Sequence, residues 1–112
     1  MQIQYSLKDF DKRGILNKYG MQKDGNLHLF LANSCFRRMQ KYVPFDTGAL
    51  STTAIVQPGS VTYTQPYAHR QYTTNKGKGL RGKYWDKKMI ANERDALTRE
   101  VESEAKRLKG SS

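Results

Sequence analysis

The sequence contains a single cysteine and no long apolar run, and both features limit the classes of protein to which the chain can belong. A single cysteine, Cys35, cannot form an internal disulfide framework. It stands in the segment LHLFLANSCFRRM, where apolar residues recur at helical spacing, so we interpret it as a buried apolar side chain and not as a reactive thiolate. No stretch approaches the roughly 20 apolar residues that span a bilayer. The first residues, MQIQYSLKDF, also lack the basic and apolar regions of a signal peptide. These absences predict a small domain with no membrane partner.

The sequence also has few residues that could carry out catalysis. An enzyme needs a nucleophile with a base, paired carboxylates or a cluster of metal ligands. His69 and Arg70 are the best nuclease candidates, but the acids nearest to them in the sequence are Asp46 and Asp86. The basic loop NKGKGLRGK, residues 75–83, lacks the GxxxxGK[ST] spacing of a phosphate-binding loop. We therefore predict no catalytic residue, no metal and no cofactor.

Acidic residues are half as numerous as basic ones. Among 112 residues, 20 are Lys or Arg and 10 are Asp or Glu, which gives a net charge of +10. Such an excess favours nucleic acid or another anionic partner, although an acidic protein neighbour or a solvated basic surface would fit equally well.

The positive charge is densest between residues 70 and 88. Tyr72, Tyr84 and Trp85 are interleaved with the cations, and exposed aromatic rings among cations can stack on unpaired bases. Trp85, however, begins an apolar helical stripe and is better explained as a core residue. The candidate residues facing DNA or a partner are Arg70, Lys76, Lys78, Arg81, Lys83, Lys87 and Lys88.

Hydrophobic periodicity predicts the first half of the fold. Residues 1–6 alternate polar and apolar, as in a short edge strand. Ser6 could cap a first helix that ends at Gly20. A second helix would begin at a cap on Asp24 or Asn26, and Pro44 would stop it. The cations Arg37, Arg38 and Lys41 would lie near its C-terminus, where they suit the helix dipole.

The second half predicts a hairpin and a long helix. Residues 52–57 and 60–65 are rich in β-branched side chains and flank Pro58-Gly59, a pair that fits a type II turn. Residues 75–83 indicate a mobile basic loop, and a helix with a solvated charged face follows from Tyr84. We expect one α+β domain over residues 1–112: a small antiparallel sheet built around the hairpin, packed against a central helix and a long C-terminal helix.

The segment YVPFDTGAL carries the most specific pattern in the chain. A proline, an aspartate and a glycine within a few residues favour a tight turn, because the aspartate accepts backbone N–H bonds and glycine permits unusual φ values. We interpret the segment as a rigid helix-to-strand connector without a reactive group. Its defining residues are Pro44, Asp46, Thr47, Gly48 and Leu50.

Three motifs in order resemble the minor capsid or tail-completion proteins of long-tailed bacteriophages. The first is the connector with the preceding Tyr42 and Val43, and the third is Trp85 near the start of the last helix. Between them stands P-Y-A, made of Pro66, Tyr67 and Ala68. The resemblance covers roughly residues 25–109, whereas residues 1–25 match poorly and form a variable N-terminal segment.

The resemblance implies a structural virion protein of the phage neck, assembled in the bacterial host cytoplasm. Such a protein would form a ring, of six copies, that completes the tail and joins it to the head around the DNA channel. Its partners would be copies of itself, the neighbouring head-completion and tail-terminator proteins and, without sequence specificity, the packaged DNA. The alternative is a small basic nucleic-acid-binding module that uses residues 70–88.

Overall fold

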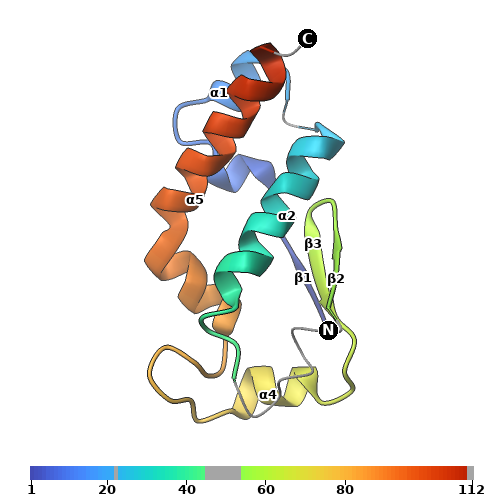
Figure 1. Cartoon of the computed structure of the whole chain (residues 1–112), viewed down its shortest axis with the longest axis vertical. Coiled ribbons are helices and arrows are strands. Elements are labelled where there is room, and N and C mark those ends of the chain that lie inside the picture. Colours follow the sequence, from blue (N-terminus) through green and yellow to red (C-terminus); the bar gives the residue numbers. More distant parts are fainter. Residues whose placement is uncertain (22, 45–53, 111–112) are drawn as a thin grey trace.

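The computed structural model describes residues 1–21, 23–44 and 54–110 (Figure 1). Two helices, α2 (Gly25–Met39) and α5 (Trp85–Gly110), pack side by side along the longest dimension of a body of 44 × 23 × 17 Å. A three-stranded sheet lies against α2 on the side away from α5. The predicted α+β architecture is therefore confirmed.

The sheet is antiparallel in the order β1 (Gln2–Gln4), β3 (Ser60–Tyr63) and β2 (Ala54–Gln57). β1 is an edge strand, as predicted, and β2 with β3 forms the predicted hairpin. Gly59 in the turn has φ +76°, the value that a type II turn requires at that position. Its N–H donates to the carbonyl of His28 at 3.2 Å, which ties the turn of the hairpin to the first turn of α2.

The prediction of one continuous first helix is wrong. The segment forms a 3-10 helix, η1 (Leu7–Phe10), and one short turn, α1 (Ile15–Lys18). Gly14 between them has φ +68°, a left-handed conformation that interrupts an α-helix. Ser6 precedes η1, but its side chain makes no capping hydrogen bond.

The central helix begins as predicted but ends earlier. The carboxylate of Asp24 accepts a hydrogen bond from the N–H of Leu27 at 2.8 Å and caps α2. The helix ends at Met39, five residues before Pro44, and Tyr42 is buried in the turn that follows. Cys35 is fully buried, and this burial raises the pKa of its thiol to about 12, so the thiol stays protonated and apolar in character.

The last helix presents the expected stripe to the core. Trp85, Met89, Leu97, Val101 and Ala105 are all fully buried. The sequence did not predict a further helix, α4 (Ala68–Thr74), which crosses the end of the molecule next to the start of α5 (Figure 1). No helix in the described part of the chain is long and apolar enough to cross a membrane.

Candidate functional site: a basic end of the molecule

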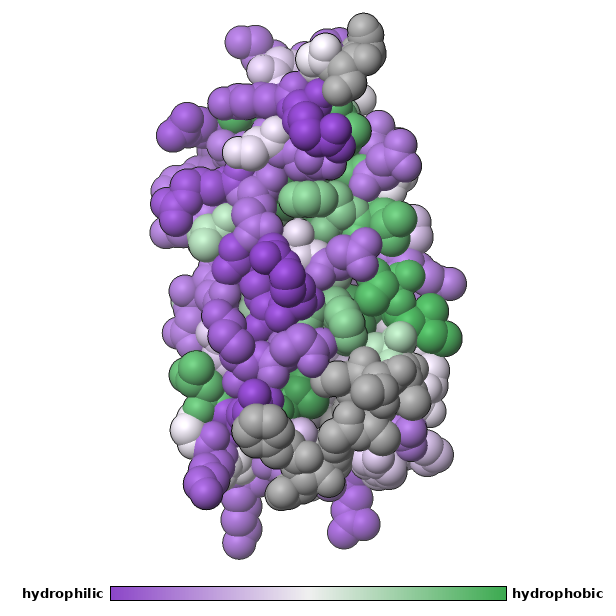
Figure 2. Space-filling model, viewed as in Figure 1, coloured by the Kyte–Doolittle hydropathy of each residue, from purple (hydrophilic) through white to green (hydrophobic). Residues whose placement is uncertain are grey.

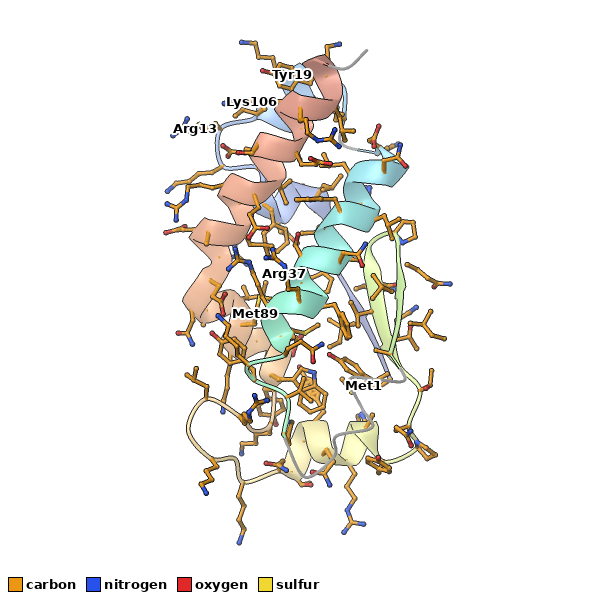
Figure 3. The ribbon with its side chains drawn as sticks, viewed as in Figure 1. Met1, Arg13, Tyr19, Arg37, Met89 and Lys106 are labelled. Carbon is orange, nitrogen blue, oxygen red and sulfur yellow. The ribbon has the colours of Figure 1, made fainter. Side chains whose placement is uncertain are left out.

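The cations predicted to face DNA or a partner gather at one end of the fold. This end is built from α4, the loop at residues 75–83 and the first turns of α5, and we call it the basic end. Long nitrogen-tipped side chains extend from it (Figure 3). The cations exposed there are Arg70, Lys76, Lys78, Lys83 and Lys87, with Lys88 half-buried.

Arg81 differs from the other predicted cations, because its guanidinium turns inward. Its Nη1 donates to the carbonyl oxygens of Gln40 at 2.7 Å and Val43 at 2.6 Å, directly after α2. Carbonyl groups at a helix C-terminus lack partners within the helix, and Arg81 supplies one. Arg81 therefore ties the loop to α2, while its predicted contact with DNA or a partner stays a prediction.

Gly77 and Gly82 allow the basic loop to fold back on itself, because a side chain at either position would collide with the backbone of the opposite side of the loop. Gly77 has φ +80°, and a Cβ there would collide with the carbonyl oxygen of Arg81. Lys78 and Arg81 exchange backbone hydrogen bonds of 2.8 and 3.1 Å, and Gly82 donates to the carbonyl of Tyr42 at 3.1 Å. These bonds fix the path of the backbone, while the mobility predicted for this loop stays a prediction.

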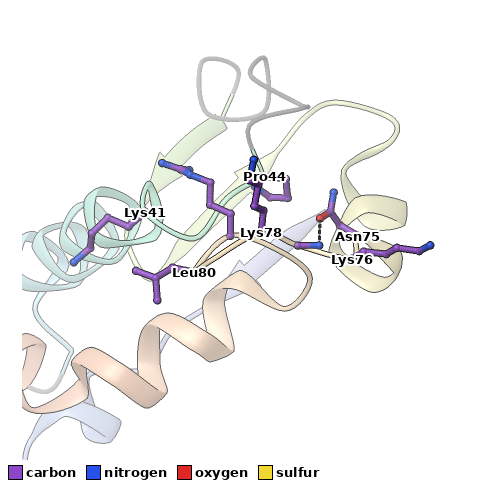
Figure 4. A pocket seen from close by; sticks show the side chains of 8 residues that line it. Lys41, Pro44, Asn75, Lys76, Lys78 and Leu80 are labelled. Atoms are coloured by element: carbon purple, nitrogen blue, oxygen red, sulfur yellow. Dashed lines mark hydrogen bonds between the residues drawn. The ribbon is translucent and has the colours of Figure 1, made fainter.

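A pocket of about 690 Å³ lies between the loop and the end of α2 (Figure 4). Lys41, Lys76 and Lys78 line it together with the structural Arg81, and Pro44 and Leu80 supply apolar wall. The N–H of Gly77 donates to Oδ1 of Asn75 at 2.8 Å and shapes one side of the rim. A concave surface lined by cations suits a phosphate or a carboxylate by charge.

Tyr84 turns the chain from the basic loop into α5. Its φ of +56° is left-handed, which is uncommon for a bulky residue, and its N–H donates to the carbonyl of Tyr72 at 2.9 Å. The ammonium groups of Lys83 and Lys87 lie 5.6 and 5.4 Å from the centre of its ring, within cation–π range. Tyr84 is 40% exposed, so it presents an aromatic surface among cations.

The neighbouring Trp85 points the other way and joins three elements in the core. Its ring lies edge-on to Tyr63 of β3, with 5.5 Å between centroids, and 5.1 Å from the ring of Tyr72 on α4. Its interpretation as a core residue is confirmed by full burial.

Asp86, the one acidic residue between residues 70 and 88, is hydrogen-bonded within the protein. Its Oδ1 accepts a hydrogen bond from the hydroxyl of Tyr72. Burial, together with this bond to a carboxylate, raises the pKa of Tyr72, so its hydroxyl remains a neutral donor. Asp86 is thereby held toward the protein, and the exposed lysines dominate the potential of the basic end.

The residues of the sequence motifs lie close to this end. Pro44 is buried and lines the pocket, whereas Asp46, Thr47, Gly48 and Leu50 lie outside the described residues. Of the P-Y-A motif, Pro66 and Tyr67 are exposed, and Ala68 is fully buried as the first residue of α4.

The nuclease candidate His69 is exposed on α4 and lines a shallow hollow with Tyr84 and Asp86. Asp86 is already bound to Tyr72. Over residues 1–21, 23–44 and 54–110, no group of three or more His, Cys, Asp or Glu residues could hold a metal ion. The His69–Arg70 pair therefore gains no metal-binding partner there.

A cluster of ion pairs between α2 and α5 was not foreseen from the sequence. Arg38 Nη1 lies 2.7 Å from Oε1 of Glu93, and its Nη2 pairs with Glu100. Glu100 also accepts from Arg37 at 2.6 Å, and Glu93 contacts Nζ of Lys41 at 3.0 Å. The hydroxyl of Tyr42 donates to Glu93 at 2.6 Å.

These contacts correct two expectations. Arg37, Arg38 and Lys41 act on the carboxylates of the neighbouring helix and not only on the dipole of their own. Glu100, on the charged face of α5 that was expected to be solvated, pairs across to α2. The signal in the sequence was the seven-residue spacing of Glu93 and Glu100, which places both on the same face of α5.

A family model described as "Minor capsid protein" matches residues 9–104. The match includes α2, the hairpin, α4 and most of α5, and it begins inside η1, further toward the N-terminus than the resemblance seen in the sequence. No curated protein and no solved structure matches the chain.

Proposed function

The chain belongs to the minor capsid protein family, which makes it a structural protein of the phage virion, and from this we propose that it acts in the neck. There it would form a ring, of six copies, that completes the tail and joins it to the head around the DNA channel. Its neighbours would be a head-completion protein on one side and a tail-terminator protein on the other.

The observation that carries this proposal is a group of exposed cations at one end of the molecule, away from the sheet. The exposed cations of the basic end come from α4, the loop and α5, while the strands of the sheet contain no charged side chain. A protein around moving DNA needs contacts with phosphates that are independent of sequence, and flexible lysines on one surface provide them. In the ring, the basic end would face the DNA channel.

Imaging of purified virions tests the location. We expect a ring at the head–tail junction into whose density the packed helices α2 and α5 can be fitted. In that fit, the basic end should point toward the axis of the DNA channel. Density in which side chains can be traced would identify the chain by Trp85 against Tyr63 and Tyr72. A particle that contains this protein only in the capsid shell would contradict the neck assignment.

Binding to duplex DNA tests the role of the basic end. Replacing Lys76, Lys78, Lys83 and Lys87 by alanine should weaken binding and reduce the salt dependence of the association constant, because each lost phosphate contact lowers the slope by about 0.9. Arg81 is left in place, since it ties the loop to α2. Salt-titrated fluorescence anisotropy with DNA of random sequence would measure both quantities.

A matched variant removes the same charge from elsewhere. Lys8, Lys12, Lys18 and Lys106 are exposed outside the basic end, and their replacement by alanine should leave the slope closer to that of the wild type. Equal losses in the two variants would show that only net charge matters. If the basic-end variant loses DNA binding while virions still assemble, the alternative of a nucleic-acid-binding module replaces the neck proposal.

A further inference from the structure

The three-stranded sheet has two outer edges without a partner strand in the described part of the chain. β3 lies in the middle and is paired on both sides, whereas β1 and β2 are each paired on one side only. An open edge offers unpaired N–H and C=O groups to another strand, and proteins usually protect it with lysine, proline or a bulge. Neither Gln2–Gln4 nor Ala54–Gln57 contains a lysine or a proline.

The hydrogen bonds show which backbone groups point outward. Met1 and Tyr5 bond to Tyr63 and Gly59, so in the alternating antiparallel pattern the backbone groups of Gln2 and Gln4 face away from β3. The backbone N–H and C=O groups of Ser60 and Thr62 in β3 point the other way, toward β2, where they pair with Gln57 and Ile55. By the same alternation, the N–H and C=O groups of Ala54 and Val56 form the outer edge of β2.

The face of the sheet turned away from α2 is uncharged. The register places Gln2, Thr62 and Ile55 in one row and Gln4, Ser60 and Gln57 in the next. Ile55 is 49% exposed, and hydrophobic residues gather on the side of the molecule that carries the hairpin (Figure 2). Residues 47–69 contain no Lys, Arg, Asp or Glu, in a chain whose net charge is +10.

We propose that the β2 edge of one copy pairs with the β1 edge of the next, so that a ring of copies shares one continuous sheet. This inference rests on the proposed ring and assigns its subunit interface. β1 and β2 are both antiparallel to β3 and therefore run in the same direction. A neighbour placed by rotation about an axis along the strands thus presents its β1 to β2 as a parallel strand.

Charge favours a second copy as the occupant. Two chains of the same strong positive charge repel each other, least where neither surface carries a charged side chain. The strands themselves carry no charged side chain, and most of the lysines and arginines lie on the helices and the basic loop. The hollow that β1 lines also contains Asp86 and Lys87, two side chains of opposite charge. A head-to-tail contact also uses both open edges and leaves none in a closed ring. A contact between two β2 edges would leave β1 unpaired.

Proline substitutions on each edge test the pairing. Gln4→Pro removes an outward N–H from β1, and Val56→Pro removes one from β2, in both cases without deleting a hydrogen bond of the sheet itself. The controls Gln4→Thr and Val56→Thr change the same side chains but keep the N–H. Native mass spectrometry and light scattering would give the size of each assembly, and circular dichroism would verify folding.

The wild type and both threonine variants are expected to form assemblies of more than two copies. Each proline variant should need at least about tenfold higher concentration to assemble. Mixing the two proline variants should give a dimer that does not grow, because the intact β2 of one meets the intact β1 of the other. One molecule of Gln4→Pro can therefore pair with one molecule of Val56→Pro, and the proline-bearing edges left over cannot pair further.

Three results would overturn the proposal. They are a wild type that stays monomeric at high concentration, proline variants that assemble like their threonine controls, and a Gln4→Pro chain that dimerises alone through β2. These outcomes are independent of where the protein lies in the virion. A ring found in the neck with another interface would refute the edge pairing alone, and edge pairing in a protein outside the neck would refute the proposed function alone.

Discussion

Replacing Trp85 by alanine is expected to cost about 3–5 kcal/mol of folding free energy, the largest effect of any single substitution considered. Its fully buried ring joins β3, α4 and α5 through the rings of Tyr63 and Tyr72. Aromatic pairs of this kind add about 0.5–1.5 kcal/mol to the effect of burial alone. A domain of this size is stable by only about 5–15 kcal/mol, so the variant should be partly unfolded at moderate temperature.

Urea unfolding followed by far-ultraviolet circular dichroism would measure the loss, because Trp85 is the only tryptophan and its removal eliminates the fluorescence signal. Trp85→Phe keeps an aromatic ring and should lose clearly less. Tyr67→Ala, at a 37% exposed position one residue before α4, should change stability by no more than about 0.5 kcal/mol. A Trp85→Ala protein within about 1 kcal/mol of the wild type would refute the role of Trp85 in joining these elements.

Replacing Glu93 by alanine is expected to cost about 2–4 kcal/mol, because it leaves the cations of α2 without this carboxylate. The Glu93 side chain is 11% exposed, and its partner Arg38 is 18% exposed. The cost falls short of that for an isolated buried charge, since Arg38 keeps its contact with Glu100. Glu104→Ala is the matched control, because Glu104 pairs with the largely exposed Arg107 on the same helix, where solvent screens the pair, and its loss should be clearly smaller than that of Glu93→Ala.

The same carboxylate predicts how stability depends on pH. Partial burial of Glu93 opposes its ionisation, but hydrogen bonds from Tyr42, Lys41 and Arg38 outweigh it and hold its pKa below the ordinary value of 4.5. The stability that Glu93 contributes is therefore complete above pH 4.5 and is lost as the pH falls through its lowered folded-state pKa. Unfolding free energies measured between pH 3 and 7 should fall less steeply below pH 4.5 in Glu93→Gln than in the wild type, and identical slopes would contradict this account.

Local patterns were enough to predict the larger elements. The three- and four-residue spacing from Leu27 to Met39 predicted α2, and Pro58-Gly59 predicted the turn of the hairpin. Both succeed because helix and strand periodicities are properties of neighbouring residues. The predicted ends of the helices were less accurate. α2 ends at Met39 and not at Pro44, and Gly14 divides the predicted first helix. Such limits depend on caps and tertiary contacts.

The roles of individual charged residues could not be predicted in this way. Arg81 belongs to a basic, glycine-rich segment and reads as a surface cation, yet it binds carbonyl groups that lie about 40 residues earlier in the chain. Glu93 and Glu100 read as a solvated face, yet they pair with α2. A charge pattern gives the position of a residue on its own helix, but only the packing of two helices decides which faces meet.

The sequence by itself determined the class of this protein: a small, basic α+β chain with Trp85 in its core, whose ordered motifs indicate a minor capsid protein. The size, charge and element types follow from composition and local spacing, whereas the family follows from the resemblance of the ordered motifs to a known group of proteins. The tertiary structure alone decided that Arg81 ties the loop to α2, that Arg38 pairs with carboxylates of α5, and that the uncharged sheet has two open edges in the described part of the chain. Each of these depends on residues far apart in the chain being brought together by the packing of α2, α5 and the hairpin.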